Sequence, residues 1–342
     1  MTTFKTLALI GAITIGLTSC TESNNELTTE LDTKILFTSN NGDGNVNIYD
    51  VSSINAVTQS TLTTNTTKAD GIYYDGDEDL IVQANRTTFG LEGYSDISIL
   101  TSSISTTVNA SVTGSLDMSS PRELAVNDNF YVVADNADAD GNETTADGRL
   151  FVYAKNGDSF TLRNTITTDI KLWGITFIGN DLYAIADTTN ELAVYSNFLS
   201  NSSTTTLSAT KQIAIEGIIR THGLTYDAMT DTMILTDIGE ASNGQDDGGF
   251  HVIENFTSKF SSTADGATLA ASEQIRIAGS NTLLGNPVDV AYDGESKTVF
   301  IAEAGNGGGR ILAYTNISND GNITPVYNAS LASASAVYLH KE

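Results

Sequence analysis

Residues 172–196 read LWGITFIGNDLYAIADTTNELAVYS, and this segment decides the predicted fold. It contains an apolar-rich strand, a polar turn, a second strand that ends in Ala-Asp, a loop and a third alternating strand. The same unit occurs six times, with second strands that end about fifty residues apart. These strands end at Asn40, Asn85, Asp135, Asp187, Asp237 and Glu303. A strand repeat of this length is typical of a β-propeller.

The first unit has no first strand upstream of residue 34, whereas the chain ends in an unpaired alternating segment, SAVYLH, from Ser335. We expect this last strand to complete the first blade, because the pairing closes the ring and removes two open sheet edges. Polar, β-branched segments such as TTTLSATKQIAI from Thr204 supply the outer, fourth strands. The sequence therefore predicts an all-β, six-bladed propeller of four-stranded blades over residues 34–342.

The N-terminus predicts export and a lipid anchor. Residues 1–19 carry one positive charge at Lys5 and an apolar run that is too short to span a bilayer but suits a signal peptide. Leu-Thr-Ser-Cys at residues 17–20 resembles a bacterial lipobox, which implies a diacylglycerol on Cys20, the only cysteine of the chain. Residues 20–33 are polar and acidic and predict a flexible tether. The expected location is the cell envelope, on the periplasmic or the outer side of the outer membrane, as in Bacteroidota lipoproteins.

Charge limits the possible partners. The formal net charge is −26, so the surface repels phosphate backbones, and nucleic-acid binding is not expected. Cations, neutral sugars, peptides and basic proteins remain compatible with it, as does a charge that serves only solubility.

The repeat is similar to a known group of propellers. Its three parts in order are Gly-apolar-x-apolar, apolar-Tyr-apolar-Ala-Asp and Arg-apolar-x-Val-Tyr. The repeat resembles those of the NHL-repeat propellers and the gluconolactonase/regucalcin-like six-bladed propellers. Pro121 and Pro287, each just before a first strand, fit the proline that often opens an NHL repeat. Such propellers include enzymes, ligand binders and protein scaffolds, so function has to be argued from individual residues.

In propellers of this kind the start of the first strand and the end of the second lie on one face, around the channel. The residues that open the first strands are Asp70, Arg122, Trp173, His222, Val288 and Ser335. The predicted ligand site at the channel mouth contains the first four of them and the acids Asp135, Asp187, Asp237 and Glu303. Alternatively, these acids accept backbone N–H groups in their own loops and face water.

Two mouth residues have further alternatives. His222 is either a general base, oriented by Asp237 or a neighbour, or a hydrogen-bonded structural residue. Trp173, the only tryptophan, is either the floor of a sugar-stacking site or a plug in the channel.

Gluconolactonase-like enzymes place metal-binding Asn or Asp before the Gly of certain first strands. Asp70-Gly71 matches this pattern, but Trp173 and His222 occupy the corresponding positions elsewhere, and no Glu occupies the first-blade position. A metal-dependent lactonase or esterase that uses Asp70 and His222 is therefore the alternative, and a binding function is the main prediction.

Residues 136–147 contain an EF-hand-like spacing of oxygen ligands. Asn136, Asp138 and Asp140 take positions 1, 3 and 5, and Asp147 takes position 12. The segment predicts bound Ca²⁺, with an acidic solvated loop as the alternative. The whole sequence thus predicts a membrane-anchored propeller that binds a small or carbohydrate ligand, or an envelope protein or glycan, at its channel mouth.

Overall fold

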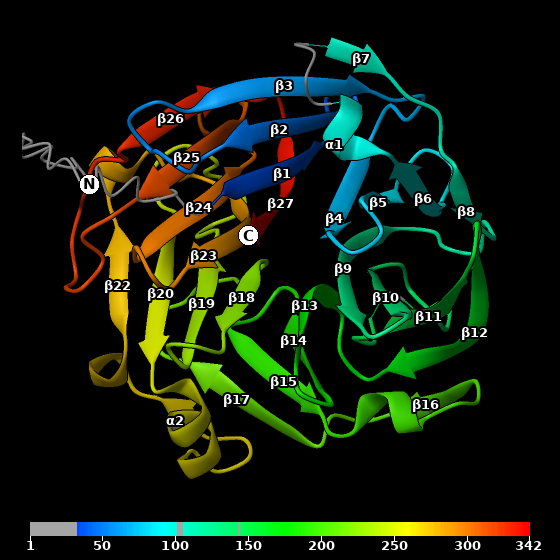
Figure 1. Cartoon of the computed structure of the whole chain (residues 1–342). Helices are drawn as coiled ribbons and strands as arrows, with labels where there is room; N and C mark the ends of the chain where they lie inside the picture. The colour runs from blue at the N-terminus through cyan, green and yellow to red at the C-terminus, as the bar shows by residue number, and fades with distance from the viewer. Residues whose placement is uncertain (1–32, 101–104, 143) are drawn as a thin grey trace, which may run out of the picture. The chain divides into compact units, whose positions relative to one another are not determined.

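The computed structural model describes residues 33–100, 105–142 and 144–342 (Figure 1). The predicted signal peptide, the lipidation site Cys20 and nearly all of the tether lie outside the described residues. Within the described part of the chain, no helix is long and apolar enough to cross a membrane.

Among the described residues, strand pairing forms six four-stranded antiparallel units; the first half of the chain supplies the first three, apart from the C-terminal strand of the first unit. The first unit contains β27 (Ala334–Lys341), β1 (Lys34–Asn40), β2 (Val46–Asp50) and β3 (Thr58–Thr63). The second contains β4 (Ala69–Asp75), β5 (Leu80–Asn85), β6 (Gly90–Ser95) and β8 (Val112–Gly114). The third contains β9 (Pro121–Asn127), β10 (Phe130–Asp135), β11 (Gly148–Asn156) and β12 (Ser159–Thr168).

The second half of the chain forms the other three units. The fourth contains β13 (Leu172–Ile178), β14 (Asp181–Ala186), β15 (Glu191–Tyr195) and β17 (Lys211–Ile215). The fifth contains β18 (Leu224–Asp227), β19 (Thr232–Asp237), β20 (Gly249–Glu254) and β22 (Ile275–Ala278). The sixth contains β23 (Pro287–Asp293), β24 (Thr298–Glu303), β25 (Arg310–Tyr314) and β26 (Tyr327–Ser330).

The ring closes as the sequence predicts. β27 pairs antiparallel with β1, with Ile35 opposite His340 and Phe37 opposite Tyr338. The inner strands β27, β4, β9, β13, β18 and β23 contact one another in turn around the centre (Figure 1). The all-β propeller prediction is confirmed, and the pairing of the last strand with the first leaves neither of them as an open edge.

Six buried apolar clusters hold the units together, one between each pair of neighbours. The cluster between the fourth and fifth units, for example, joins Ile185 and Leu192 to Met233 and Phe256. Because each sheet is apolar on both faces, a unit buries its surface only against two neighbours, and this requirement favours a closed ring.

The outer edge differs in one detail from the sequence prediction. The segment from Thr204 forms two strands rather than one: β17 is the fourth strand of its unit, whereas β16 (Thr205–Leu207) pairs in parallel with β12 of the preceding unit. The short strands β7 (Ser105–Thr107) and β21 (Thr268–Leu269) likewise extend β3 and β17. These pairings cover outer edges that would otherwise expose unpaired backbone groups. The remaining helical turns are α1 (Ile97–Leu100), α2 (Phe256–Ser262), η1 (Phe198–Ser200), η2 (Ala271–Glu273), η3 (Ser280–Thr282) and η4 (Asn306–Gly308).

Glycines let the inner strands approach closely at one level of the channel. A Cβ added at Gly71 would lie 2.5 Å from the backbone nitrogen of Leu124, and one at Gly174 would lie 2.4 Å from the carbonyl oxygen of His222. At Gly223 it would lie 2.5 Å from the Cα of Asp289. Each glycine thus contacts the inner strand of the next unit at a distance that no larger residue permits.

We predict that Gly223→Ala lowers the free energy of unfolding by about 1–3 kcal/mol, because the new methyl group has to displace the backbone of β23. Gly321→Ala is the matched control, since its nearest neighbour would be a side-chain methyl group at 3.4 Å. Urea denaturation of the two variants measures the difference. Equal stability of both variants would contradict the close-approach argument.

Candidate functional site

β-Bulges place the predicted mouth residues. In five of the six units the register of the inner strand shifts by one residue at the mouth end. The shifts involve Asp70, Arg122, Trp173, Val288 and Ser335. A bulge redirects a side chain that would otherwise follow the pleat of the sheet. His222 lies just before β18, which begins at Leu224, so it occupies the equivalent position of the fifth unit.

Three of these side chains form a continuous stack. The rings of Trp173 and His222 are parallel to within 3°, with centroids 3.6 Å apart. The guanidinium carbon of Arg122 lies 4.5 Å from the centroid of the Trp173 ring. Because Arg122 and His222 come from the units on either side of Trp173, they cover its two opposite faces. Neither face of this indole is open for stacking on a sugar, so the geometry favours the plug over the sugar-binding floor.

Asp187 anchors one end of the stack. Its Oδ1 atom lies 3.2 Å from Nε2 of His222 and accepts hydrogen bonds from Nε and Nη2 of Arg220, at 2.9 and 2.7 Å. Asp187, not Asp237, is therefore the acid beside His222, because the end of β14 lies next to the fifth unit at the mouth. Burial lowers the pKa of His222, so the imidazole is neutral at pH 7. Burial alone would raise the pKa of Asp187, but the contacts with His222 and Arg220 leave it below its usual value.

Asp70 anchors the other end. Its Oδ2 atom lies 3.4 Å from Nη1 of both Arg86 and Arg122, and its Oδ1 accepts a 2.6 Å hydrogen bond from Asn41. Burial raises the pKa of this carboxyl group, and the two arginines oppose the rise without cancelling it. A contact network thus runs from Arg86 to Arg220 across the second to fifth units.

The other acids at the strand ends have backbone partners. Asp135 accepts N–H groups of Ser119, Ser120 and Ala137, and Asp237 accepts those of Ile219, Arg220 and Gly239. Glu303 accepts four, from Gly285, Asn286, Gly305 and Asn306. These three side chains are fully buried rather than facing water. Their backbone bonds match the structural alternative, because an acid at a strand end stabilises the loop that follows it.

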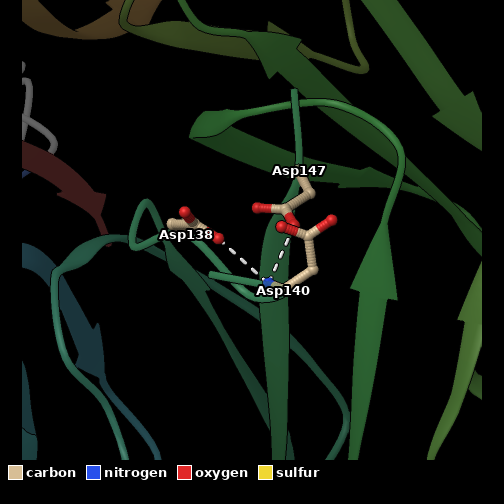
Figure 2. A group of neighbouring side chains, drawn as sticks. All are labelled: Asp138, Asp140 and Asp147. Carbon is tan, nitrogen blue, oxygen red and sulfur yellow. Dashed lines mark hydrogen bonds between the residues drawn. The ribbon is translucent and has the colours of Figure 1, made fainter. Parts of the chain in front are cut away.

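The predicted calcium loop gathers three of its four residues (Figure 2). One carboxylate oxygen from each of Asp138, Asp140 and Asp147 lies within 4.8 Å of the other two. Asn136 points elsewhere: its Nδ2 donates to the carbonyl oxygen of Leu172 and to Asp187. Asp138 and Asp147 already accept the N–H of Asp140 (Figure 2). Three carboxylates are suitable donors for a hard cation, and calcium at this loop remains a prediction.

A metal at the mouth fits the residues poorly. Asp70 lies between two guanidinium groups, and the only imidazole of the stack contacts Asp187 across one nitrogen. Three arginines of fixed positive charge would repel a divalent cation there. The metal-dependent use of Asp70 and His222 is therefore not supported by the geometry.

A cavity of 320 Å³ occupies the channel beyond the stack. Its wall comes from the inner strands of all six units, beginning with Glu123 and Asp289 and including Tyr73, Tyr226, Tyr292 and Tyr338. Glu123 and Asp289 each lie one residue along the strand from the mouth residues Arg122 and Val288. The stack of Arg122, Trp173 and His222 therefore lies at the mouth end of the cavity. Asp227 and Lys341 line the cavity near the other ends of their strands.

Glu123 and Asp289 form a carboxyl pair in this cavity. Their carboxyl groups lie close enough that each affects the pKa of the other. Asp289 also accepts the N–H of Val337 at 2.7 Å, and Glu123 accepts that of Leu124 at 2.8 Å. Burial raises the pKa of both groups, that of Asp289 to about 7, so the pair shares a proton near neutral pH.

This pair has no cationic partner within salt-bridge distance among the described residues, whereas three other buried acids at the ends of the channel do. Asp70 has Arg86 and Arg122, Asp187 has Arg220, and Asp293 has Lys34 and Lys341. The pair is not apparent from the sequence, because each acid lies within an ordinary alternating strand. One sequence feature distinguishes the two acids. They occupy the position in the inner strand that is a glycine in three other units, namely Gly71, Gly174 and Gly223.

Several solved structures share this fold. A chain of the nidogen/laminin complex has a TM-score of 0.59 and 12% identity, and the match covers 90% of this chain and 98% of that one. A candidate 6-phosphogluconolactonase from Bacteroides fragilis has a TM-score of 0.58 and 8% identity, with 92% and 99% covered. One from Bacteroides uniformis has a TM-score of 0.56 and 13% identity, with 88% and 84% covered.

These identities show a common fold and nothing finer, so the β-propeller is confirmed and the resemblance to NHL-repeat proteins is not tested further. No protein-family profile matches the sequence, and no curated protein does.

The raised pKa of Asp289 makes a prediction about stability. A carboxyl group with a higher pKa in the folded than in the unfolded protein stabilises the fold at low pH, and this contribution is lost as the pH rises from about 4 to about 7. Over this pH range we expect the free energy of unfolding of the wild type to fall by about 1–3 kcal/mol because of the pair. The free energy of unfolding of Asp289→Asn should fall much less. Chemical denaturation at pH 4 and pH 8 measures both.

Asp293→Asn is the control with the opposite sign. The Lys34 contact holds the pKa of Asp293 at about 2 although burial opposes this, so its stabilisation is present at pH 8 and lost only below about pH 4. Asp293→Asn should therefore weaken the fold at pH 8. A wild type and an Asp289→Asn variant with the same pH dependence would contradict the shared proton.

Proposed function

We propose that this protein is a binding propeller that holds a small organic cation, such as an amine, in its central channel. The observation that carries the proposal is the Glu123–Asp289 pair in a cavity of 320 Å³ without a basic partner. Ligand pockets commonly have volumes of about 300–1,000 Å³ and a few convergent polar groups, so the cavity is large enough for a small ligand.

Charge favours a cation over an anion in this cavity. Glu123, Asp289 and Asp227 line it, whereas Lys341 is the one basic residue among the lining residues. The formal charge of −26 adds a long-range field of the same sign, which raises the local concentration of cations. An ammonium group could also displace the shared proton and provide the charge compensation that the pair lacks.

The aromatic wall suits the organic part of such a ligand. Tyr73 and Tyr338 meet edge to face, with centroids 4.9 Å apart, and Tyr73 also contacts Tyr131 in this way. Tyr226 is held by a hydrogen bond from its hydroxyl group to Asp231. Fixed tyrosine rings offer apolar surface, and their faces attract cations.

The test is calorimetric titration at pH 7 with cyclohexylamine and with cyclohexanol, its uncharged match. We expect the amine to bind at least tenfold more tightly and to release a proton, so that the measured enthalpy differs between buffers of different ionisation enthalpy. Glu123→Gln should weaken amine binding at least tenfold. Asp227→Asn, which alters the end of the cavity away from the carboxyl pair, should weaken it less. Equal binding of amine and alcohol would contradict the proposal.

A hydrolase of lactone or ester type is the second candidate. Two structural neighbours are candidate 6-phosphogluconolactonases, and a carboxyl pair with raised pKa values is suited to general acid–base chemistry. In the same samples, turnover of gluconolactone by the wild type but not by Glu123→Gln would identify this activity, and turnover that survives the substitution would exclude the pair as its site.

We further propose that the propeller is an exported lipoprotein, held at the cell envelope through Cys20, with an envelope protein or glycan as a possible additional partner. The support is the apolar segment and the lipobox-like residues before the cysteine. Expression of the full chain in a bacterial host should give a membrane-associated protein whose N-terminal peptide begins at Cys20 and carries acyl chains by mass spectrometry. Cys20→Ser should give no acylated product. An unmodified Cys20 in the wild type would contradict the anchor.

A further inference from the structure

On the side of the mouth formed by the second and third units, two guanidinium groups lie beside one carboxylate, that of Asp70. We propose that Arg86 and Arg122 bind an oxyanion, the carboxylate or phosphate group of a small ligand, at this face of the propeller. The site is separate from the amine site, because the stack of Trp173 and His222 lies between this face and the cavity.

The distances suit one bridging group. Nη1 of Arg86 and Nη1 of Arg122 each lie 3.4 Å from the same Oδ2 atom of Asp70, so the two nitrogens are at most about 6.8 Å apart. A carboxylate or phosphate can span this separation with one charge-assisted hydrogen bond to each arginine.

Donors remain available for such a group. A guanidinium carries five N–H donors. Apart from its contact with the Trp173 ring, Arg122 makes two hydrogen bonds to the described residues, both long at 3.4 Å, to Asp70 and to the carbonyl oxygen of Pro121, and its buried Nε has no partner among them. Within the part of the chain that the structure describes, the ion pair of Arg86 is the 3.4 Å contact with Asp70. Arg220 differs, because two of its nitrogens bind Asp187 at 2.9 and 2.7 Å.

Other buried polar atoms at the mouth also lack partners. Among the described residues, Nδ1 of His222 and Oγ1 of Thr221 have no hydrogen-bond partner, although His222 is 3% exposed and Thr221 is fully buried; both lie beyond Trp173 from Arg122 and extend the polar, unpaired region of the mouth. A buried polar atom without a partner costs about 1–3 kcal/mol, and such atoms commonly mark the position of a bound water or ligand.

Electrostatics favours an anion locally. Two guanidiniums share the single negative charge of Asp70, and each repels the other. Burial lowers the pKa of Arg122, Asp70 opposes this, and Arg86 lowers it further. An oxyanion bound between the two arginines would relieve this repulsion. The rest of the surface is negative and repels anions, so anion binding is expected only beside these arginines.

The test is calorimetric titration of the full propeller with sodium phosphate and with sodium gluconate, which separates phosphate from carboxylate as the recognised group. We expect at least one of them to bind, and Arg86→Gln to weaken it at least tenfold. Arg276→Gln is the matched control, since this arginine is 42% exposed and lies 3.8 Å from Asp237. Raising the sodium chloride concentration should weaken binding by the wild type.

Arg122→Gln should have a similar effect. Because this substitution also removes a contact on one face of Trp173, urea denaturation checks whether the variant is folded. If it is unfolded, the result for Arg86→Gln alone tests the anion site. Binding of neither anion to the wild type, or equal loss in Arg86→Gln and Arg276→Gln, would overturn the site. Glu123→Gln should keep the anion binding and Arg86→Gln should keep the cyclohexylamine binding, so the two proposals fail independently.

Discussion

The structure depends on how closely six inner strands can approach around one axis. Gly71, Gly174 and Gly223 lie where an added Cβ would come within about 2.5 Å of the next unit. Side chains larger than glycine at this level have to point into the channel or force the ring apart. Glu123 and Asp289 occupy the same level in two other units, and for this reason their carboxyl groups meet inside the channel.

This placement separates two kinds of buried charge. At the mouth, Asp70 and Asp187 lie beside arginines that can never lose their charge, so both carboxylates have permanent counterions. In the cavity, the pair has only backbone N–H groups and each other, and it lowers its electrostatic cost by retaining a proton. A proton can be exchanged for another cation, whereas the mouth pairs are compensated by fixed charges of the protein itself.

The two ends of the channel consequently differ in chemistry. The stack of Arg122, Trp173 and His222 lies between them, and it uses side chains from three consecutive units. Loss of Trp173 would remove contacts across two unit interfaces, and loss of His222 would remove contacts across one. The stack therefore contributes to closing the ring as well as to separating the cavity from the mouth.

The sequence by itself determined the fold, because strand periodicity and the fifty-residue repeat are local properties that survive without knowledge of contacts. It also placed Asp70, Arg122, Trp173 and His222 on one face, since each opens an inner strand. The tertiary structure decided what these residues do: that His222 contacts Asp187 rather than Asp237, that both faces of Trp173 are covered, and that Glu123 meets Asp289 from a strand more than 160 positions away. Such contacts depend on the curvature and closure of the ring, which no local pattern encodes.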